Sequence, residues 1–326
     1  MRYANIGGQA VIEGVMMRYK DLYAVAVRKE DGSVQVEHKS YEGLNSRFHT
    51  RRIPIVRGVL AFLDSLYLGI GTLTWSAELA DDEEEEEQEK EKSRGAEIRD
   101  RAAIVFSLVL SVVIAVALFM LAPLGAAALI TGHTDNQVLI AVVEGIVRLI
   151  IFFLYIYLIS KMKDIERVFM YHGAEHKTIN CIEHGLELTP ENAEKCSRLH
   201  KRCGTSFLLY VMIISIIVFM FVRASTPVGR VVSRLVLIPL VAGLSYEFIQ
   251  FAGRSNSKIS DVLSRPGLAM QKLTTKEPDR DMLEVAIASI EAIYDWRGFQ
   301  KEVSAAVRKA ARTMIDKHRA QCSDAR

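Results

Sequence analysis

The chain has 326 residues, of which half are hydrophobic and a quarter are charged, and its formal net charge is +2 at pH 7. This near-neutral balance, with no long basic stripe, does not favour nucleic acid as a partner. The charges are unevenly spread, and the stretch from Gly204 to Val222 holds no Asp, Glu, Lys, Arg or His. Because such a run matches the roughly 18–20 residues of a membrane span, a purely soluble protein is excluded.

Residues 1–54 are predicted to form a small β-rich cytoplasmic segment. Apolar residues alternate with others along 23–28 and 34–36, and Asp31-Gly32 between these stretches is a hairpin signal. The N-terminus has no apolar core after a basic start, so a signal peptide is not expected.

An additional strand, bent at Gly14, is expected over residues 9–18. Glu13 lies inside this apolar strand, where a carboxylate is more often paired with an arginine than catalytic. Arg18 and Arg57 are the candidate partners.

Residues 55–80 are apolar but contain Arg57 and Asp64. We expect a buried or interfacial helix here, with a membrane crossing as the open alternative. Residues 81–101 contain a run of acidic residues, which is typical of a solvated linker.

Two pairs of transmembrane helices are predicted next, the first and second within 102–160 and the third and fourth within 206–253. The expected spans are about 103–131, 138–160, 206–222 and 232–252. A bend is expected at Pro123 in the first of them. A polar cytoplasmic segment, 161–205, separates the two pairs.

Residues 254–326 are expected to form a cytoplasmic helical tail, with an amphipathic pattern from Asp281 to about Lys317. The predicted fold class is therefore a mainly α polytopic membrane protein. It has about four transmembrane helices, a small N-terminal β-rich part and a C-terminal helical tail.

The distribution of Lys and Arg predicts the orientation. Basic residues precede the first span, open the 161–205 segment and follow the fourth span, whereas the connection 132–137 has no Lys or Arg. Arg223 and Arg230 in the third connection oppose this assignment. The balance places both termini and the 161–205 segment in the cytoplasm.

Four cysteines are too few for a disulfide scaffold, and three of them lie in the segment assigned to the cytoplasm. They are Cys181, Cys196, Cys203 and Cys322. We expect reduced thiols, one of which could serve as a metal ligand.

The sequence His-x-x-Glu-His, formed by His172, Glu175 and His176, is the strongest chemical signal in the chain. On a helix these positions share one face, so the two imidazoles can bind one divalent metal ion. Glu175 lies beside them, placed to take a proton from water that the metal activates. The pattern is the inverted form of the His-Glu-x-x-His zinc motif, and zinc is the expected metal.

Two imidazoles leave a catalytic metal short of at least one protein ligand. Glu183 lies two helical turns beyond His176, and both His200 and Cys203 lie just before the third span, which would hold them near the motif. These three residues are the expected further metal ligands. Two alternatives stay open. One is a surface helix whose His and Glu make salt bridges, and the other is a structural Cys/His zinc clip that uses Cys181, Cys196 or Cys203.

The predicted spans contain three notable charges. Glu144 and Arg148 are four residues apart in the second span, so they can form an internal ion pair that aids packing or part of a polar path. Glu247 lies toward the cytoplasmic end of the fourth span and is a candidate to line the metal site. A transporter or channel would use all three.

Four motifs in order carry a resemblance to a known family. They are Gly-Gly-Gln-Ala-Val-Ile-Glu-Gly-Val-Met-Met-Arg (7–18), Tyr-His-Gly-Ala-Glu-His-Lys-Thr-Ile-Asn-Cys (171–181), Arg-Cys-Gly-Thr-Ser-Phe (202–207) and Leu-Thr-Thr-Lys-Glu-Pro-Asp (273–279). On these motifs the chain resembles the YqhQ-like family of uncharacterised bacterial membrane proteins, which carry the general label of metal-dependent enzymes. The resemblance extends to about Ala288 and implies a polytopic membrane protein.

The resemblance places His172, Glu175 and His176 in the family signature. It also marks as motif positions Glu183, His200, Cys203, Glu247, Glu277 and Asp279. Two residues depart from the expected pattern, since Lys201 stands where a proline is expected and Ile182 where an aromatic residue is expected. Neither changes a candidate ligand, and the family supplies no established substrate.

The sequence favours a membrane-embedded, metal-dependent hydrolase at the cytoplasmic face of the bacterial inner membrane. In this hypothesis His172 and His176 bind zinc, Glu175 is the general base or the third ligand, and Glu247 is a second catalytic candidate. Membrane lipids are the expected partners, and the substrate would be a lipid-linked or membrane-protein group. A transporter or channel and a membrane assembly factor are the alternatives.

Overall fold

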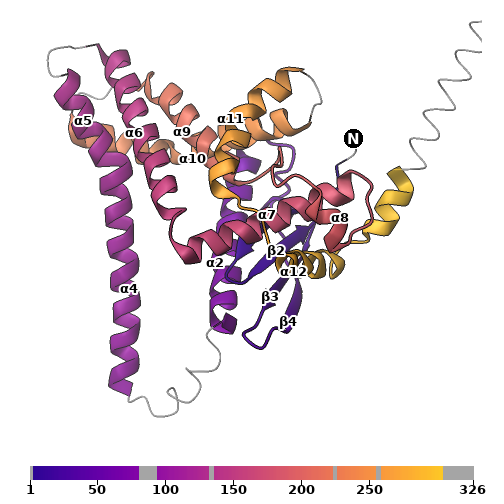
Figure 1. Cartoon of the computed structure of the whole chain (residues 1–326). Coiled ribbons are helices and arrows are strands. Elements are labelled where there is room, and N and C mark those ends of the chain that lie inside the picture. The colour runs from indigo at the N-terminus through magenta and orange to yellow at the C-terminus, as the bar shows by residue number, and fades with distance from the viewer. Residues whose placement is uncertain (1–2, 81–93, 132–135, 223–225, 255–257, 304–326) are drawn as a thin grey trace, which may run out of the picture.

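The structure is a computed structural model, which describes residues 3–80, 94–131, 136–222, 226–254 and 258–303. Its strands are β1 (Gly7–Val11), β2 (Gly14–Tyr19), β3 (Leu22–Arg28) and β4 (Val34–Ser40). Its helices are α1 (Leu44–Arg47), α2 (Val56–Ala80), α4 (Arg94–Val116), the π-helix η1 (Ala117–Leu121), α5 (Ala122–Thr131), α6 (Gln137–Ile159), α7 (Lys163–Glu183), α8 (Pro190–Glu194), α9 (Thr205–Phe219), α10 (Pro227–Arg254), α11 (Lys258–Thr274) and α12 (Arg280–Glu291). The predicted mainly helical fold with an N-terminal β-rich part is confirmed (Figure 1).

The four strands form one antiparallel sheet in the order β1-β2-β3-β4. The predicted hairpin at Asp31-Gly32 joins β3 to β4, and Gly32 has a φ of +83°, which glycine adopts without strain. The backbone N–H of Lys29 donates to the carbonyl of Ser33 at 2.9 Å and closes the turn.

The single bent strand expected over residues 9–18 is instead the hairpin of β1 and β2, in which Val11 pairs with Gly14. The chain reverses because Glu13 takes a φ of +49° at the turn. Its carboxylate pairs with Arg167 of α7, so the expected arginine partner exists but is neither of the two candidates. That partner lies 154 residues away, a distance that no local pattern reveals.

The sheet is the middle of three layers. Alternate residues of β2 point to opposite faces, so that Val15 and Met17 join a core with α7 and α12, whereas Met16 joins Leu68 of α2. The sheet, α7 and α12 therefore share one hydrophobic core, and α2 covers the other face.

Helix α2 buries its small and polar side and exposes its apolar side. Thr72 and Ser76 are buried against the sheet, where Gln9 Nε2 donates to Thr72 Oγ1 at 2.9 Å and the N–H of Ile12 donates to Ser76 Oγ at 3.1 Å. Exposed large apolar residues on the other side are Leu63, Leu66, Tyr67, Ile70 and Leu73. This arrangement leaves the apolar side of the helix for a membrane, and both the interfacial helix and the membrane crossing stay predictions.

Within the part of the chain that the structure describes, four helices are long and apolar enough to cross a membrane, which suggests a membrane protein. They are Val56–Ala80, Val105–Leu129, Val138–Ile159 and Val231–Ala252. The set differs from the prediction in one member, because α2 meets the length criterion and the apolar helix Thr205–Phe219 does not. At 15 residues α9 is about 23 Å long, shorter than the bilayer's hydrocarbon core of about 30 Å.

The predicted bend at Pro123 coincides with a local change of helix type. The π-helix Ala117–Leu121 directly precedes α5, in which Pro123 is the second residue. Proline has no N–H to offer the carbonyl four residues earlier, that of Phe119. Arg148 Nε donates to this carbonyl at 3.1 Å, so α6 supplies the hydrogen bond that the proline cannot make.

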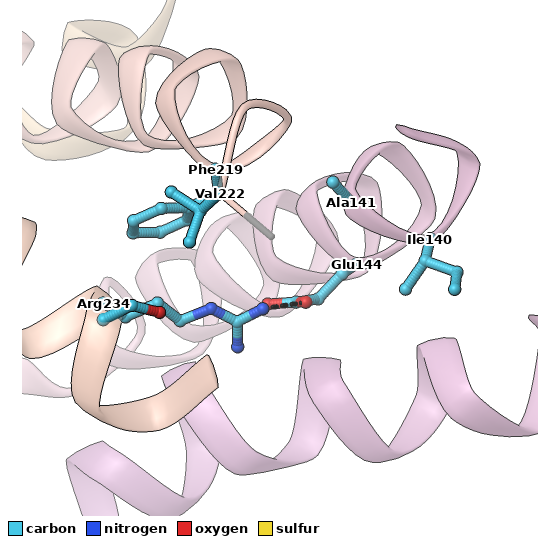
Figure 2. Close-up of a pocket in the computed structure, with 7 residues that line it drawn as sticks. Ile140, Ala141, Glu144, Phe219, Val222 and Arg234 are labelled. Carbon is cyan, nitrogen blue, oxygen red and sulfur yellow. Dashed lines mark hydrogen bonds and ion pairs between the residues drawn. The ribbon is translucent and has the colours of Figure 1, made fainter. Parts of the chain in front are cut away.

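The intramembrane ion pair predicted on α6 is present, with Arg148 Nη2 at 2.6 Å from Glu144 Oε1. A second arginine, Arg234 of α10, reaches the other oxygen of the same carboxylate (Figure 2). The cluster therefore holds two guanidinium groups and one carboxylate.

Two segments differ from their predicted bounds. Helix α4 begins at Arg94, so residues 94–101 are helical and do not belong to the predicted linker 81–101. In the tail, α12 ends at Glu291 and a turn follows, which interrupts the amphipathic helix expected to about Lys317. Residues 81–93 and 304–326, including Cys322, lie outside the described residues.

Candidate metal centre

The His-x-x-Glu-His motif lies on α7, as its spacing predicts, and every residue from Tyr171 to Glu183 is buried. The helix comes so close to the chain after α11 that a Cβ on Gly173 would lie 2.0 Å from the carbonyl oxygen of Lys276. The N–H of Lys276 donates to the carbonyl of Phe169 at 2.8 Å. Glycine is therefore required within the motif, because only its missing side chain permits this contact.

Both imidazoles are oriented by backbone carbonyls. Nδ1 of His172 lies 2.8 Å from the carbonyl oxygen of Thr274, and Nδ1 of His176 lies 2.6 Å from that of Arg198. A carbonyl oxygen can only accept, so each Nδ1 carries a proton and donates it. Both Nε2 atoms are left as the metal-binding nitrogens, in the arrangement that commonly orients histidine ligands.

Cys203 completes the group. Its Sγ lies 3.1 Å from His172 Nε2 and accepts from the N–H of Thr205 at 3.4 Å. One donor atom each from His172, His176 and Cys203 can be chosen so that all lie within 4.8 Å of one another. Tetrahedral zinc with bonds of about 2.0 Å to nitrogen and 2.3 Å to sulfur separates such donors by about 3.5 Å, so small shifts would suffice to fit the ion.

The charge balance of the group fits a divalent cation. Burial opposes ionisation of Cys203, but His172 and His176 outweigh burial and hold the pKa of the thiol well below 9. Burial likewise opposes protonation of His172, but Cys203 raises the pKa of this imidazole to about 9. Nε2 of His176 is buried and has no hydrogen-bond partner among the described residues. A metal would give this nitrogen a partner and replace the proton on His172.

Glu175 lies between the two histidine positions and is itself buried. Burial raises the pKa of its carboxyl group, against the opposing effect of the two imidazoles. The Cβ that Gly8 lacks would lie 3.1 Å from the Glu175 carboxyl carbon, so glycine in β1 leaves room beside this group. Glu175 lines two cavities, so its carboxyl group is accessible to a molecule bound in either of them.

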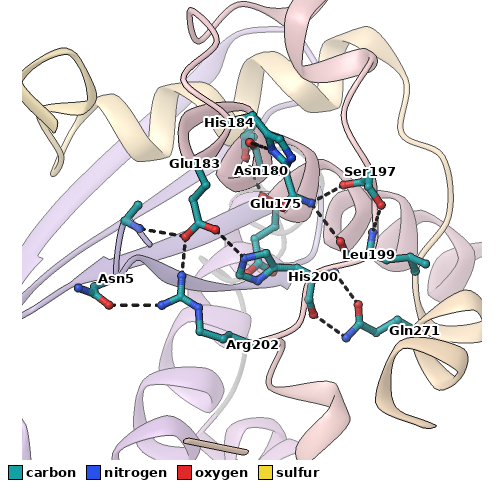
Figure 3. A network of polar contacts seen from close by, with 12 residues as sticks. Asn5, Glu175, Asn180, Glu183, His184, Ser197, Leu199, His200, Arg202 and Gln271 are labelled. Carbon is teal, nitrogen blue, oxygen red and sulfur yellow. Dashed lines mark hydrogen bonds and ion pairs between the residues drawn. The ribbon is translucent and has the colours of Figure 1, made fainter. Parts of the chain in front are cut away.

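Two of the predicted ligands, Glu183 and His200, lie beside the group and bond to each other. His200 Nε2 is 3.3 Å from Glu183 Oε2, while Glu183 Oε1 accepts from Arg202 and from the N–H of Ala4 at 2.9 Å (Figure 3). Burial opposes ionisation of Glu183, but the hydrogen bond from His200 and the charge of Arg202 hold its pKa below 4.5. Glu183 therefore connects Ala4 near the N-terminus to His200 and Arg202 in the loop after α8.

This loop is held by residues that sequence reasoning missed. Gln271 of α11 accepts from the N–H of His200 at 2.9 Å and donates to its carbonyl at 2.8 Å. Asn180 Nδ2 donates to the carbonyls of Ser197 and Leu199 at 2.7 and 3.1 Å (Figure 3). The only sequence signal for Asn180 was its place inside a recognised motif, and Gln271 had none.

Glu247 is placed away from the metal group. Arg57 Nε donates to its carboxylate at 2.7 Å, and the contact joins α10 to the start of α2. Its neighbour Tyr246 lines both cavities of the centre, whereas Glu247 is not among their lining residues. The geometry thus gives Glu247 a structural ion pair and does not support the predicted catalytic role.

The alternative arrangements fit the structure less well. A surface helix with ordinary salt bridges does not fit, because the motif is buried. A cysteine clip does not fit either, because Cys181 Sγ donates to the carbonyl of Glu187 at 3.3 Å and Cys196 Sγ to that of Asn192 at 3.4 Å. Among the described residues, the group with donor atoms close enough for one metal ion is that of the two histidines and Cys203.

Two cavities meet at the centre. One, of about 520 Å³, extends from His172 and Glu175 between α2, α7, α9 and α10. The other, of about 410 Å³, extends from Glu175 and His200 along the β1–β2 edge of the sheet. Glu175, Arg202 and Cys203 line both, so the metal group lies where the two cavities join.

Comparison with known proteins gives a family but no activity. The family described as proteins of unknown function, DUF1385, matches residues 53–296. The uncharacterised protein YqhQ of Bacillus subtilis is 38% identical over 299 residues, which cover 88% of this chain and 91% of that protein. No solved structure matches the chain. The chain therefore belongs to the DUF1385 family, as its resemblance to YqhQ-like proteins predicts.

Proposed function

We propose that the protein is a metal-dependent hydrolase that acts at the cytoplasmic face of the membrane. The observation that carries this proposal is the buried group of His172, His176 and Cys203, whose donor atoms lie within 4.8 Å of one another on the side of the helix that also holds the buried Glu175. Three protein ligands with one open position are typical of catalytic zinc, whereas structural zinc usually has four. Open cavities on both sides give substrate access to this position.

The residues of the centre have different roles in the proposed reaction. A divalent metal held by the group supplies Lewis acidity, which activates water near neutral pH. Glu175 takes the proton from the attacking water and returns it to the leaving group. The carbonyls of Thr274 and Arg198 hold the imidazoles in position through the reaction, because each fixes one Nδ1.

The shared core supports the proposed topology. The sheet, α7 and α12 pack in one core, so they lie on one side of the membrane. Because the sheet and α7 lie on the same side, the chain between them must cross the membrane an even number of times. Three apolar segments lie in this part of the chain, namely α2, the segment from α4 to α5, and α6, so one of them does not cross. Helix α2 packs along the sheet and is therefore the segment that does not cross. The chain between α7 and α12 must also cross an even number of times, so α9 crosses together with α10. Local thinning of the bilayer can accommodate the short length of α9.

A metal analysis of the purified full chain tests the proposal. His172→Ala, His176→Ala and Cys203→Ser should each lose most of the bound metal, because each removes one of three donors. His184→Ala is the matched control at the C-terminal end of the same helix, since His184 is exposed and its Nδ1 donates to the carbonyl of Asn180.

Glu175→Gln separates the two roles left open for this residue. As the general base, it should keep the metal while hydrolysis of chromogenic ester and phosphoester probes falls by roughly two to four orders of magnitude. Loss of metal in this variant would make Glu175 a ligand. Full metal occupancy in the His172→Ala, His176→Ala double variant would end the proposal.

A further inference from the structure

The larger cavity at the metal centre is lined mainly by apolar side chains from four helices. They include Phe62, Phe169, Phe207, Leu208 and Ile249. Phe207 lies in the first turn of α9 and Ile249 near the last turns of α10. In the proposed topology these helix ends lie at the cytoplasmic leaflet. The cavity is therefore placed where the chain of a lipid could enter from the membrane.

The second cavity is lined by more basic side chains. Arg18, Lys20 and Arg202 line it, and Glu175 is the acidic residue among its lining residues. Arg202 is stacked on Tyr3 and paired with Glu183, but its buried Nε has no hydrogen-bond partner among the described residues. An excess of cationic groups beside a metal favours an anionic group such as phosphate, which accepts several charge-assisted hydrogen bonds.

We propose that the two cavities together bind a phosphate-headed amphiphile, with its head group in the basic cavity and its hydrocarbon chain in the apolar one. The assignment rests on the proposed function, because it places the phosphoester bond at the metal group. Both cavities fall in the roughly 300–1,000 Å³ range of small-molecule sites. Phosphatidate, a lipid that ends in an anionic phosphate, and a polyprenyl phosphate share this chemistry. A membrane peptide would not explain a basic cavity next to an apolar one.

Lipid binding can be measured without turnover. The Glu175→Gln full chain in detergent is offered dioleoyl phosphatidate, a polyprenyl phosphate or phosphatidylcholine, and bound lipid is counted by native mass spectrometry. A phosphate-headed lipid should be retained and the zwitterionic lipid should not. The phosphate-headed lipid that binds more tightly identifies the source. Retention of neither phosphate-headed lipid overturns the assignment.

Two changes test the two cavities separately. Arg18→Gln combined with Lys20→Gln should weaken retention by roughly 10–100-fold for each charge-assisted contact that is lost. Ala61→Trp fills the apolar cavity and should abolish retention, whereas Leu66→Trp on the same helix lies outside both cavities and should not. Equal retention by Ala61→Trp and Leu66→Trp would overturn the placement of the chain.

The outcome also separates this assignment from the proposed hydrolase. If the lipid is retained but the zinc-loaded wild-type protein releases no product from it or from the chromogenic probes, the hydrolase fails and the lipid site stands. If a membrane peptide is cleaved and no phosphate-headed lipid is retained, the lipid site fails and the hydrolase stands.

Discussion

The charge cluster between α6 and α10 predicts an asymmetric response to substitution. Glu144 is 3% exposed and lies between Arg148 and Arg234, which are 8% and 11% exposed, so three buried charges sum to +1. Glu144→Gln leaves two buried like charges and should destabilise the fold by about 3–5 kcal/mol. Arg234→Met leaves a neutral pair and should cost about 1–3 kcal/mol, the value of the contact it removes.

Equilibrium unfolding in mixed detergent micelles measures both free energies. A transporter would respond differently, because a polar path needs the charges for ion passage and not for packing. If Glu144→Gln unfolds no more easily than Arg234→Met, the net-charge argument is wrong. If both variants keep full stability but lose ion flux in liposomes, the transport hypothesis replaces the packing one. The cavity beside Glu144 and Arg234 is partly open and has a volume of only about 30 Å³, which favours packing over an ion path.

Two further predictions concern Glu183 and the topology. Because the pKa of Glu183 is depressed in the folded state, its ion pairs should stabilise the fold above about pH 4.5, and this contribution should fade as the pH falls further. Unfolding curves of wild type and Glu183→Gln should therefore differ at neutral pH and converge in acid, and a constant difference would contradict this account. In the topology test, a reporter fused after Met162 should be cytoplasmic and one fused after Thr226 external, and an external Met162 fusion would overturn both the topology and the cytoplasmic site.

Local periodicity allowed the motif helix and the intramembrane pair to be predicted. His172 and His176, like Glu144 and Arg148, are four residues apart, and this spacing alone brings side chains together on a helix. The hairpin after β3 could also be predicted from the sequence, because its turn requires a glycine. Local chemistry determines each of these features, so no knowledge of the fold was needed.

Long-range partners could not be read in this way. Arg234 is 90 residues from Glu144, and the arginine that pairs with Glu13 is 154 residues from it. A charge in a sequence shows the need for a partner but not which of many arginines supplies it. The buried side of α2 could not be read from the sequence either, because it holds Thr72 and Ser76, which bond to the sheet, whereas the apolar side is exposed.

The orientation of the metal-binding nitrogens depends on backbone atoms, which carry no residue identity in a sequence. The carbonyl that fixes His172 belongs to Thr274, the last residue of α11, and the thiol belongs to Cys203, two residues before α9. Helices α9 and α11 pack against each other, so both partners move with the membrane-proximal helices and not with α7. The donors can therefore converge only when α7 is docked onto α9 and α11. A metal held by this group would thus depend on the folded chain as a whole, because the His-x-x-Glu-His segment alone lacks both the carbonyl and the thiol that complete the group.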